Sequence, residues 1–449
     1  MSLLACLGRH TVTGMLTCAG RQFCDWSADY RLFAAARVAP EALFAVNRRE
    51  VAAQLAPDAP LVVAMDDTLL RKTGRKIPGV AWRRDPLGPP FRTNLVRAQR
   101  FIQRSAALMP SGGPGPCRMV PIGFDHAPSL RKPGQNASAE RVAEYKQQQR
   151  QHNLSRQGAD LLVKLRADLD RDEPAAPRIL WVPVDGSYTN RTVLGDLPER
   201  TVLIGRIRGD ARLFHPFDGQ RSATGRPRRY GARAPTPEGL RRDEEIPWQR
   251  VEVFAAGKLH QLRIKTLAPV LWKPAGYQRP LRLIVIAPLA YRPSRNSRLL
   301  YREPAYLVVT DPDLAPEQAV QAYLYRWDIE VNHRDEKQLI GVGQAQVRSP
   351  ASARNVPAFA VAVYGMLLLA ATRAFGLHGL PGAIPPPRWR RGQAKARAST
   401  ADLISHLRHE LWAEALQPER FSGFADSAGR TATPQKLEPD LTSALLYAA

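Results

Sequence analysis

The sequence has few cysteines, with four among 449 residues, at positions 6, 18, 24 and 117. None of them forms a C-x2-C pair, which argues against a zinc site of the usual spacing. Four scattered cysteines are also too few for a disulfide scaffold, so we expect a protein of the reducing cytoplasm.

Long apolar runs and targeting segments are equally scarce. The longest apolar run covers residues 356–371 and Arg373 follows it closely. This run is shorter than the roughly 20 residues that a membrane span needs, so it predicts a buried core helix and no membrane partner. The first ten residues, MSLLACLGRH, lack a basic region ahead of their short apolar run, so we expect no signal peptide.

Acidic residues are in the minority. The chain has 65 Lys and Arg against 41 Asp and Glu, a formal net charge of +24. Such a charge favours a polyanionic partner, most often nucleic acid or an anionic membrane. With 44% hydrophobic residues the balance is that of a folded protein rather than a disordered one.

Apolar strand-like runs alternate with helical stretches, which predicts a mixed α/β fold. The runs LVVAM at 61–65 and ILWVPV at 179–184 predict buried strands that stop on carboxylates. A long helical stretch is expected from Ser138, and another helix from Pro316 that carries residues 323–337. Probable strands at 249–256, 259–266 and 281–287 indicate a β-rich segment between these helices.

Three carboxylate positions follow from these elements. Asp67, with Asp66 as its neighbour, and Asp185 come at the ends of the two apolar strands. The edge beyond the strand ends is the usual site position in an α/β sheet. Taken singly, each acid fits an ordinary turn or helix cap better than a functional site.

The third position lies on the helix of residues 323–337. Tyr323, Arg326, Glu330 and Lys337 fall within a single arc roughly 60° wide, whereas the acids at 328, 335 and 336 fall on other faces. The simpler interpretation is an exposed Arg–Glu ion pair at i, i+4, which contributes only about 0.3–0.5 kcal/mol to a helix. Such a pair does not require Tyr323 and Lys337 on the same face.

Three carboxylates from two strand ends and one helix would form an oxygen-rich site of the kind that Mg²⁺ prefers. Two such ions can activate a water or a 3′-OH and stabilise the leaving oxygen in phosphoryl transfer. Arg326 and Lys337 would then hold the phosphates of a DNA strand across the ions.

The motif Tyr-x2-Arg-x3-Glu-x6-Lys, formed by Tyr323, Arg326, Glu330 and Lys337, resembles the Y-R-E-K motif of DDE transposases from a large group of bacterial insertion sequences. DDT at 66–68 with RKTGRK after it resembles the first Asp block of that group. VDGSYTNR at 184–191 with LIGRIRGDARL after it resembles the second. The resemblance covers residues 25–410.

The resemblance implies an RNase H-like mixed sheet flanked by helices, with a β-rich insertion before the Glu-bearing helix and a helical N-terminal region. The expected parts, in chain order, are a DNA-binding region over 1–57, the first part of the catalytic core over 58–209 and the β-rich insertion over 210–300. The second part of the core, with the Glu helix, follows over 301–378, and a basic linker with a last helix over 379–449.

The resemblance also implies the site residues. Asp67, Asp185 and Glu330 would be the catalytic, metal-binding triad. Asp67 is preferred to Asp66 because the family's Asp usually sits directly before the Thr. The ions would be Mg²⁺, two of them, with Mn²⁺ able to substitute. Contacts to DNA are expected from Tyr323, Arg326, Lys337, Trp327, Arg206 and Arg208. Trp327 would stack on a flipped base, and core packing is its alternative.

The function implied is a cut-and-paste transposase that binds the inverted repeats at its element's ends, cleaves there and joins the 3′-OH ends to target DNA. Its expected partners are double-stranded DNA and a second copy of the chain in the DNA complex, in the bacterial cytoplasm at the nucleoid. A non-catalytic DNA-binding descendant and a structure-selective nuclease of the same fold are the alternatives. Three basic runs, at 71–84, 221–233 and 388–397, would line the DNA path.

Overall fold

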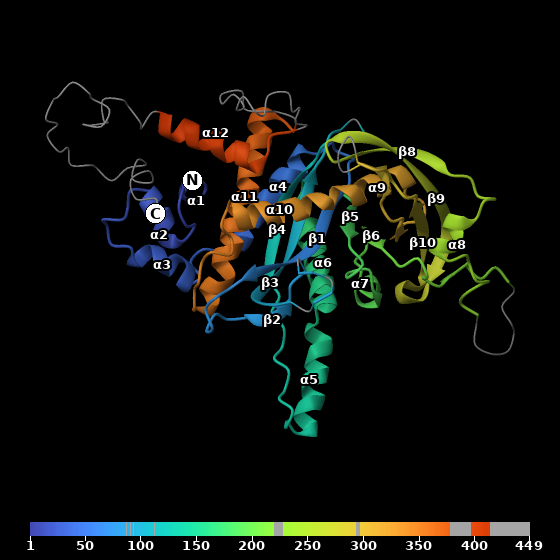
Figure 1. Ribbon diagram of the computed structural model, residues 1–449, viewed down its shortest axis with the longest axis horizontal. Helices are drawn as coiled ribbons and strands as arrows, with labels where there is room; N and C mark the ends of the chain where they lie inside the picture. The colour runs from blue at the N-terminus through green and yellow to red at the C-terminus, as the bar shows by residue number, and fades with distance from the viewer. Residues whose placement is uncertain are drawn as a thin grey trace.

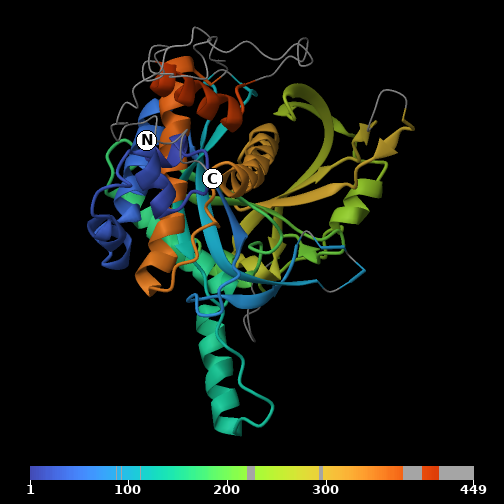
Figure 2. The ribbon, with the colours of Figure 1, turned by 60° about the vertical axis from the view of Figure 1, so that its left-hand side comes forward.

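The computed structural model describes residues 1–413 apart from positions 87, 90, 93, 112, 220–227, 293–296 and 378–396. A large twisted sheet runs through the molecule with helices on both faces, and one helical arm projects away from the body (Figures 1 and 2). Arg221, Arg226 and the basic run from Arg388 to Lys395 lie outside the described residues.

The sheet begins with three antiparallel strands and continues with two parallel ones. β3 pairs antiparallel with both β1 and β4, while β5 and β6 run parallel to β1. The short strand β2 pairs antiparallel with the first residues of β3, from Leu95 to Ala98. The strands of this half are β1 (Leu61–Arg71), β2 (Ala81–Arg84), β3 (Leu95–Leu108), β4 (Arg118–His126), β5 (Leu180–Val184) and β6 (Thr201–Arg206). This mixed sheet with helices on both faces confirms the expected fold class.

The β-rich segment continues the same sheet rather than forming a separate one. β13 pairs antiparallel with β6, β10 with β13, and β9 with β10. The expected strands at 249–256, 259–266 and 281–287 correspond to β8, β9 and β10. The strands of this half are β7 (Leu213–Phe214), β8 (Gln249–Ala255), β9 (Lys258–Trp272), β10 (Gly276–Ile286) and β13 (Ala305–Val309), with β11 (Ala290–Tyr291) and β12 (Leu300–Tyr301) as a separate pair.

The sequence predicted that β1 stops at its two aspartates, but the strand runs on to Arg71. The reason is its partner, because β3 pairs with it residue by residue from Val63 to Arg71. Asp66 and Asp67 are therefore successive strand residues whose side chains leave opposite faces of the sheet. The expectation that Asp185 directly follows a strand is confirmed, since β5 ends at Val184.

Two apolar layers cover the two faces of β1. Val63 and Met65 pack with α4 (Pro40–Gln54) and α6 (Leu154–Asp170) on one face. Val62 and Ala64 pack with α9 (Pro316–Tyr325) and the start of α10 (Trp327–Gln338) on the other. The alternation of side chains along β1 thus decides which helices each aspartate faces.

The apolar run at 356–371 lies within α11 (Pro350–Phe375), which packs against β4 and α4. By length and composition α11 could cross a membrane, and it is the one such helix among the described residues. Most of its apolar side chains are buried in this fold, which confirms the expected core helix. The expected last helix is α12 (Thr400–Ala413), and Ser399 and Asp402 exchange hydrogen bonds at its start.

The helical stretch from Ser138 is two helices, not one. α5 (Ala139–His152) begins where Ser138 accepts a hydrogen bond from the Arg141 amide, and Asn153 then caps α6. The remaining helices are short: α1 (Ser2–Ala5), α2 (Val12–Cys18), α3 (Ser27–Ala34), α7 (Arg191–Gly195), α8 (Pro237–Arg242) and a 3-10 turn at Lys273–Ala275.

Leu307 on β13 tests whether the two halves of the sheet unfold together. It is fully buried, in the apolar layer that joins β6, β10 and α9. We expect Leu307→Ala to lower the free energy of unfolding by about 2–5 kcal/mol, measured by chemical denaturation, and to shift one shared transition. Leu259→Ala, at an exposed position of β9, should change it by about 0.5 kcal/mol or less. Two transitions, of which only one moves, would contradict a single cooperative sheet.

Candidate active site

Asp66 lies on the face of β1 that meets the Glu-bearing helix. Its Oδ2 is 3.7 Å from the Arg326 guanidinium, and its Oδ1 accepts a hydrogen bond from the Asp67 amide at 2.8 Å. The pKa of this carboxyl is raised from 3.8 to about 7, by burial first and by the nearby Asp185 second, with Arg326 opposing both effects. The site therefore holds more negative charge than its own cation offsets.

Asp185 reaches the same region from the neighbouring strand. The parallel register places Val184 beside Met65, so the residues that follow, Asp185 and Asp66, are also neighbours. The Asp185 carboxylate accepts hydrogen bonds from the backbone amide and the hydroxyl of Ser187, at 2.9 and 2.6 Å. These bonds fix the tight turn that leaves β5, in which Gly186 brings the chain close to Arg206 of β6.

Glu330 approaches from α10. The helix expected over residues 323–337 is broken at Arg326, where α9 ends and α10 begins. The Arg326 guanidinium packs over the Tyr323 ring at 5.5 Å from its centre and donates a 3.2 Å hydrogen bond to Glu330. Since the same guanidinium reaches Asp66, it connects the helix acid to the strand acid.

Asp67 faces the other side of the sheet. Its carboxylate pairs with Arg100 of β3 at 3.2 Å, and burial, opposed by Arg100, raises its pKa. Tyr188 is buried beside it, and burial together with the Asp67 carboxylate raises the pKa of that phenol. The structure thus brings Asp66 and Glu330 to Arg326 and places Asp67 on the opposite face. Asp185 lies next to Asp66, and its charge raises the pKa of Asp66 and of Asp67.

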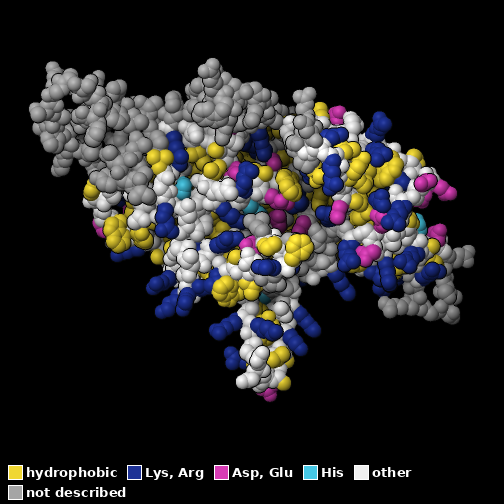
Figure 3. Space-filling model, in the orientation of Figure 1, with side chains coloured by type: hydrophobic (Ala, Val, Ile, Leu, Met, Phe, Trp, Pro, Cys, Tyr) yellow, Lys and Arg dark blue, Asp and Glu magenta, His cyan; other side chains and the backbone are white. Residues whose placement is uncertain are grey.

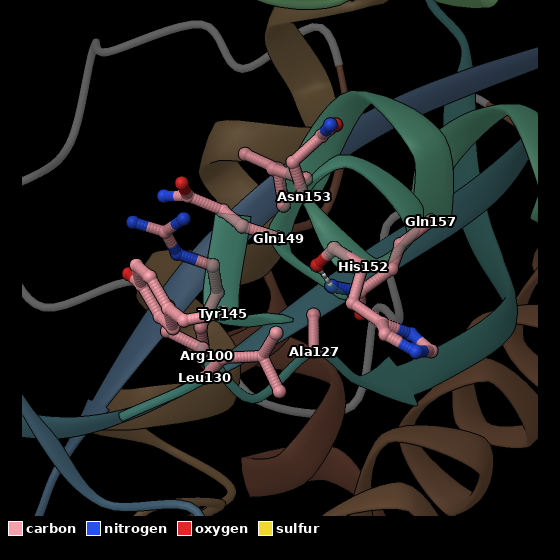
Figure 4. Close-up of a pocket in the computed structure, with 10 residues that line it drawn as sticks. Arg100, Ala127, Leu130, Tyr145, Gln149, His152, Asn153 and Gln157 are labelled. Atoms are coloured by element: carbon pink, nitrogen blue, oxygen red, sulfur yellow. Dashed lines mark hydrogen bonds between the residues drawn. The ribbon is translucent and has the colours of Figure 1, made fainter. Parts of the chain in front are cut away.

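Arg100 also lines a pocket of about 200 Å³ at the root of the projecting arm (Figure 4). Its other walls come from the segment after β4 and from the junction of α5 and α6, including Tyr145, Gln149 and His152. The sequence carried no signal for this pocket, because it forms between segments far apart in the chain.

The expected DNA contacts differ in exposure. Trp327 is 61% exposed, so the core-packing alternative for it is excluded. Lys337, Arg206 and Arg208 are also exposed, and Arg208 is paired with Asp210 at 2.9 Å. Arg326 is 9% exposed and so is mostly covered by its own partners.

The other acids of α10 are structural. Asp328 pairs with Arg397 at 2.8 Å, and Asp335 accepts a 2.7 Å hydrogen bond from Thr400, which ties α10 to the start of α12. Glu336 is fully buried and accepts a 2.8 Å hydrogen bond from Gln103 of β3. The sequence pattern placed these acids on other faces of the helix but did not reveal how deeply Glu336 is buried.

The donor set fits a hard divalent cation. Within the described part of the chain, no three His, Cys, Asp or Glu side chains lie closely enough to hold a metal ion in this conformation. Asp185 is nevertheless close enough for its charge to raise the pKa of Asp66, and a bound cation would relieve that repulsion. Carboxylate oxygens are the ligands that Mg²⁺ prefers.

Comparison with known proteins identifies the family of the chain. Residues 1–274 match the family model described as DDE superfamily endonuclease. The chain belongs to this family. No curated protein matches the sequence of this endonuclease.

Membership of the family confirms the likeness to DDE transposases and implies a metal-dependent nuclease that acts on DNA. The surface of the endonuclease agrees with such a substrate. A small group of acidic side chains lies near the middle of the face in Figure 3, with Lys and Arg side chains around it. The grouping of a few carboxylates within a basic surface suits the phosphates of a nucleic acid.

Glu336 makes the stability of α10 depend on pH. Burial raises its pKa from 4.5 to about 8, so the folded protein keeps this proton while the unfolded chain has lost it. Stability from this group is full below about pH 4.5 and falls as the pH rises to about 8. We expect Glu336→Gln, which mimics the protonated acid, to gain up to roughly 4 kcal/mol relative to wild type between pH 4.5 and 9, measured by denaturant unfolding.

The exposed acid Glu244 gives the matched control, because Glu244→Gln should show the same pH dependence as wild type. If Glu336→Gln and wild type keep a constant difference across this range, Glu336 is not held protonated in the folded protein.

Proposed function

We propose that this endonuclease is a DNA transposase of the Y-R-E-K group, which binds the terminal inverted repeats of its element, cleaves at their ends and joins the 3′-OH ends to target DNA. The observation that carries the proposal is the contact of one buried guanidinium, that of Arg326, with both Asp66 and Glu330. A nuclease of this family needs carboxylates from strand and helix to converge, and this contact draws them to one place.

Asp66, Asp185 and Glu330 would hold the metal. We prefer Asp66 to Asp67, the residue expected from the sequence, because Asp66 shares a face of β1 with Glu330 and Asp67 does not. Mg²⁺, when bound there as one or two ions, would activate the attacking oxygen and stabilise the leaving one. Mn²⁺ would substitute.

The protein's own side chains orient the DNA. Arg326 holds Glu330 toward Asp66, and its stack on Tyr323 fixes its direction. Lys337 and Arg206 are exposed and free to meet phosphates near the carboxylates, as point charge and planar fork respectively. Trp327, exposed beside Arg326, is available to stack on an unpaired base.

The reaction implies further partners. Joining two ends of an element to a target brings a second copy of the chain into the DNA complex. A basic protein that acts on chromosomal DNA would work in the bacterial cytoplasm at the nucleoid. Release of cleaved ends without joining to target DNA would instead indicate a nuclease, and sequencing of the products separates the two reactions.

The two neighbouring aspartates provide a matched test of the site. We expect Asp66→Asn, Asp185→Asn and Glu330→Gln each to lower Mg²⁺-dependent cleavage at least about 100-fold, because each removes a ligand whose loss costs several kcal/mol in the transition state. Asp67→Asn, one residue away on the opposite face, should cleave within about tenfold of wild type. The assay uses a supercoiled plasmid that carries the gene with its flanking DNA.

Loss of cleavage in Asp67→Asn with full activity in Asp66→Asn would contradict the assignment and restore the choice that the sequence favours. Full activity in both Asp185→Asn and Glu330→Gln would refute the whole site.

A further inference from the structure

The arm formed by residues 128–152 has no buried residue. It comprises the segment after β4 and the whole of α5, and it projects from the body in both ribbon views (Figures 1 and 2). No residue of α5 is buried, so this helix contributes nothing to the core.

A helix in that position has little to stabilise it. Isolated helices shorter than about 12–15 residues are marginal in water, and most helices in proteins depend on packing of an apolar face. α5 has 14 residues, good helix formers and a side-chain cap at Ser138, but no packed face. The helix is about 21 Å long, and its whole length is therefore open to contact with another molecule.

The side chains of the arm suit a polyanion. Five exposed bases lie along it, against two acids, Glu140 and Glu144; the bases are Arg131, Lys132, Arg141, Lys146 and Arg150. Among the described residues none of these five forms an ion pair with a carboxylate. Dark-blue Lys and Arg side chains accordingly stand out around the arm in Figure 3.

The root of the arm lies next to the catalytic strand. Tyr145 and Gln149 line the same pocket as Arg100, and Arg100 pairs with Asp67, the residue after Asp66 (Figure 4). The Arg100 carbonyl also accepts a 2.8 Å hydrogen bond from Ala127, where the arm begins. A molecule bound at the root of the arm therefore lies next to β1, on the face opposite to the site.

We propose that this arm is a second DNA-contact element, which grips the phosphate backbone of duplex DNA outside the cleavage site. Its occupant is DNA rather than a second copy of the chain, because a copy also carries +24 and would repel a basic arm. The inference rests on DNA being the substrate of the proposed function. The arm supplies affinity and position, not chemistry and not base recognition.

The test measures binding of a mixed-sequence linear duplex as a function of salt, by fluorescence anisotropy without divalent metal. We expect the triple variant Arg141→Gln, Lys146→Gln, Arg150→Gln to bind at least tenfold more weakly than wild type at moderate salt. The slope of log K against log salt should fall by about 0.9 for each lost phosphate contact, because fewer counterions are released.

Two matched variants separate charge from shape. Arg141→Lys with Arg150→Lys keeps the charges and should keep most of the salt slope. Gln147→Ala, Gln148→Ala, Gln151→Ala changes exposed uncharged residues of the same helix and should bind like wild type.

An unchanged affinity and slope in the Gln triple variant would overturn the proposal, as would equal losses in the Lys and Gln variants. Lost self-association without DNA, in place of lost DNA binding, would assign the arm to a second copy. This test measures binding only, and so its result is independent of the cleavage assay. A wild type that binds with this salt slope but does not cleave in that assay would refute the proposed transposase and leave the role of the arm intact.

Discussion

The site depends on negative charge held at the middle of a buried strand. Asp66 cannot ionise there without the cost of burial and of repulsion from Asp185, and one cation, Arg326, offsets only part of both. Carboxylates that repel one another bind either a proton or a metal ion, and the two compete. A metal ion that displaces the proton from Asp66 would lower the pKa of that carboxyl and hold β1 and α10 together.

The rest of the structure holds the third carboxylate against that strand. α10 is anchored on its buried side by Glu336 to β3 and by Asp335 to the start of α12, which leaves Glu330 on the side that faces Asp66. The long sheet has the same effect at a larger scale, because the β-rich segment extends it through β13 and so carries α9 and α10 over β1. On the opposite face, Asp67 and Arg100 connect β1 to the root of the arm.

Local patterns were sufficient to predict the elements and the carboxylate-bearing segments. The apolar runs before Asp66 and Asp185 predicted β1 and β5, and the helical spacing of Tyr323, Arg326 and Glu330 predicted their shared stripe. Other features depend on contacts between distant segments and so were not predictable. Pairing with β3 carries β1 past its two aspartates, and which of them faces α10 follows from the layer that each side of β1 packs against. The exposed arm was missed because its helical pattern continues into α6, which is buried.

The most direct test of this account is the binding of Mn²⁺ followed by electron paramagnetic resonance in the absence of DNA and in its presence. We expect wild type and Asp67→Asn to bind the ion with similar affinity, and Asp66→Asn and Glu330→Gln to bind it at least about tenfold more weakly, since each loses a carboxylate ligand. Equal affinity in wild type and Asp66→Asn, with binding lost in Asp67→Asn, would contradict the central claim that the metal lies on the face of β1 shared with Arg326.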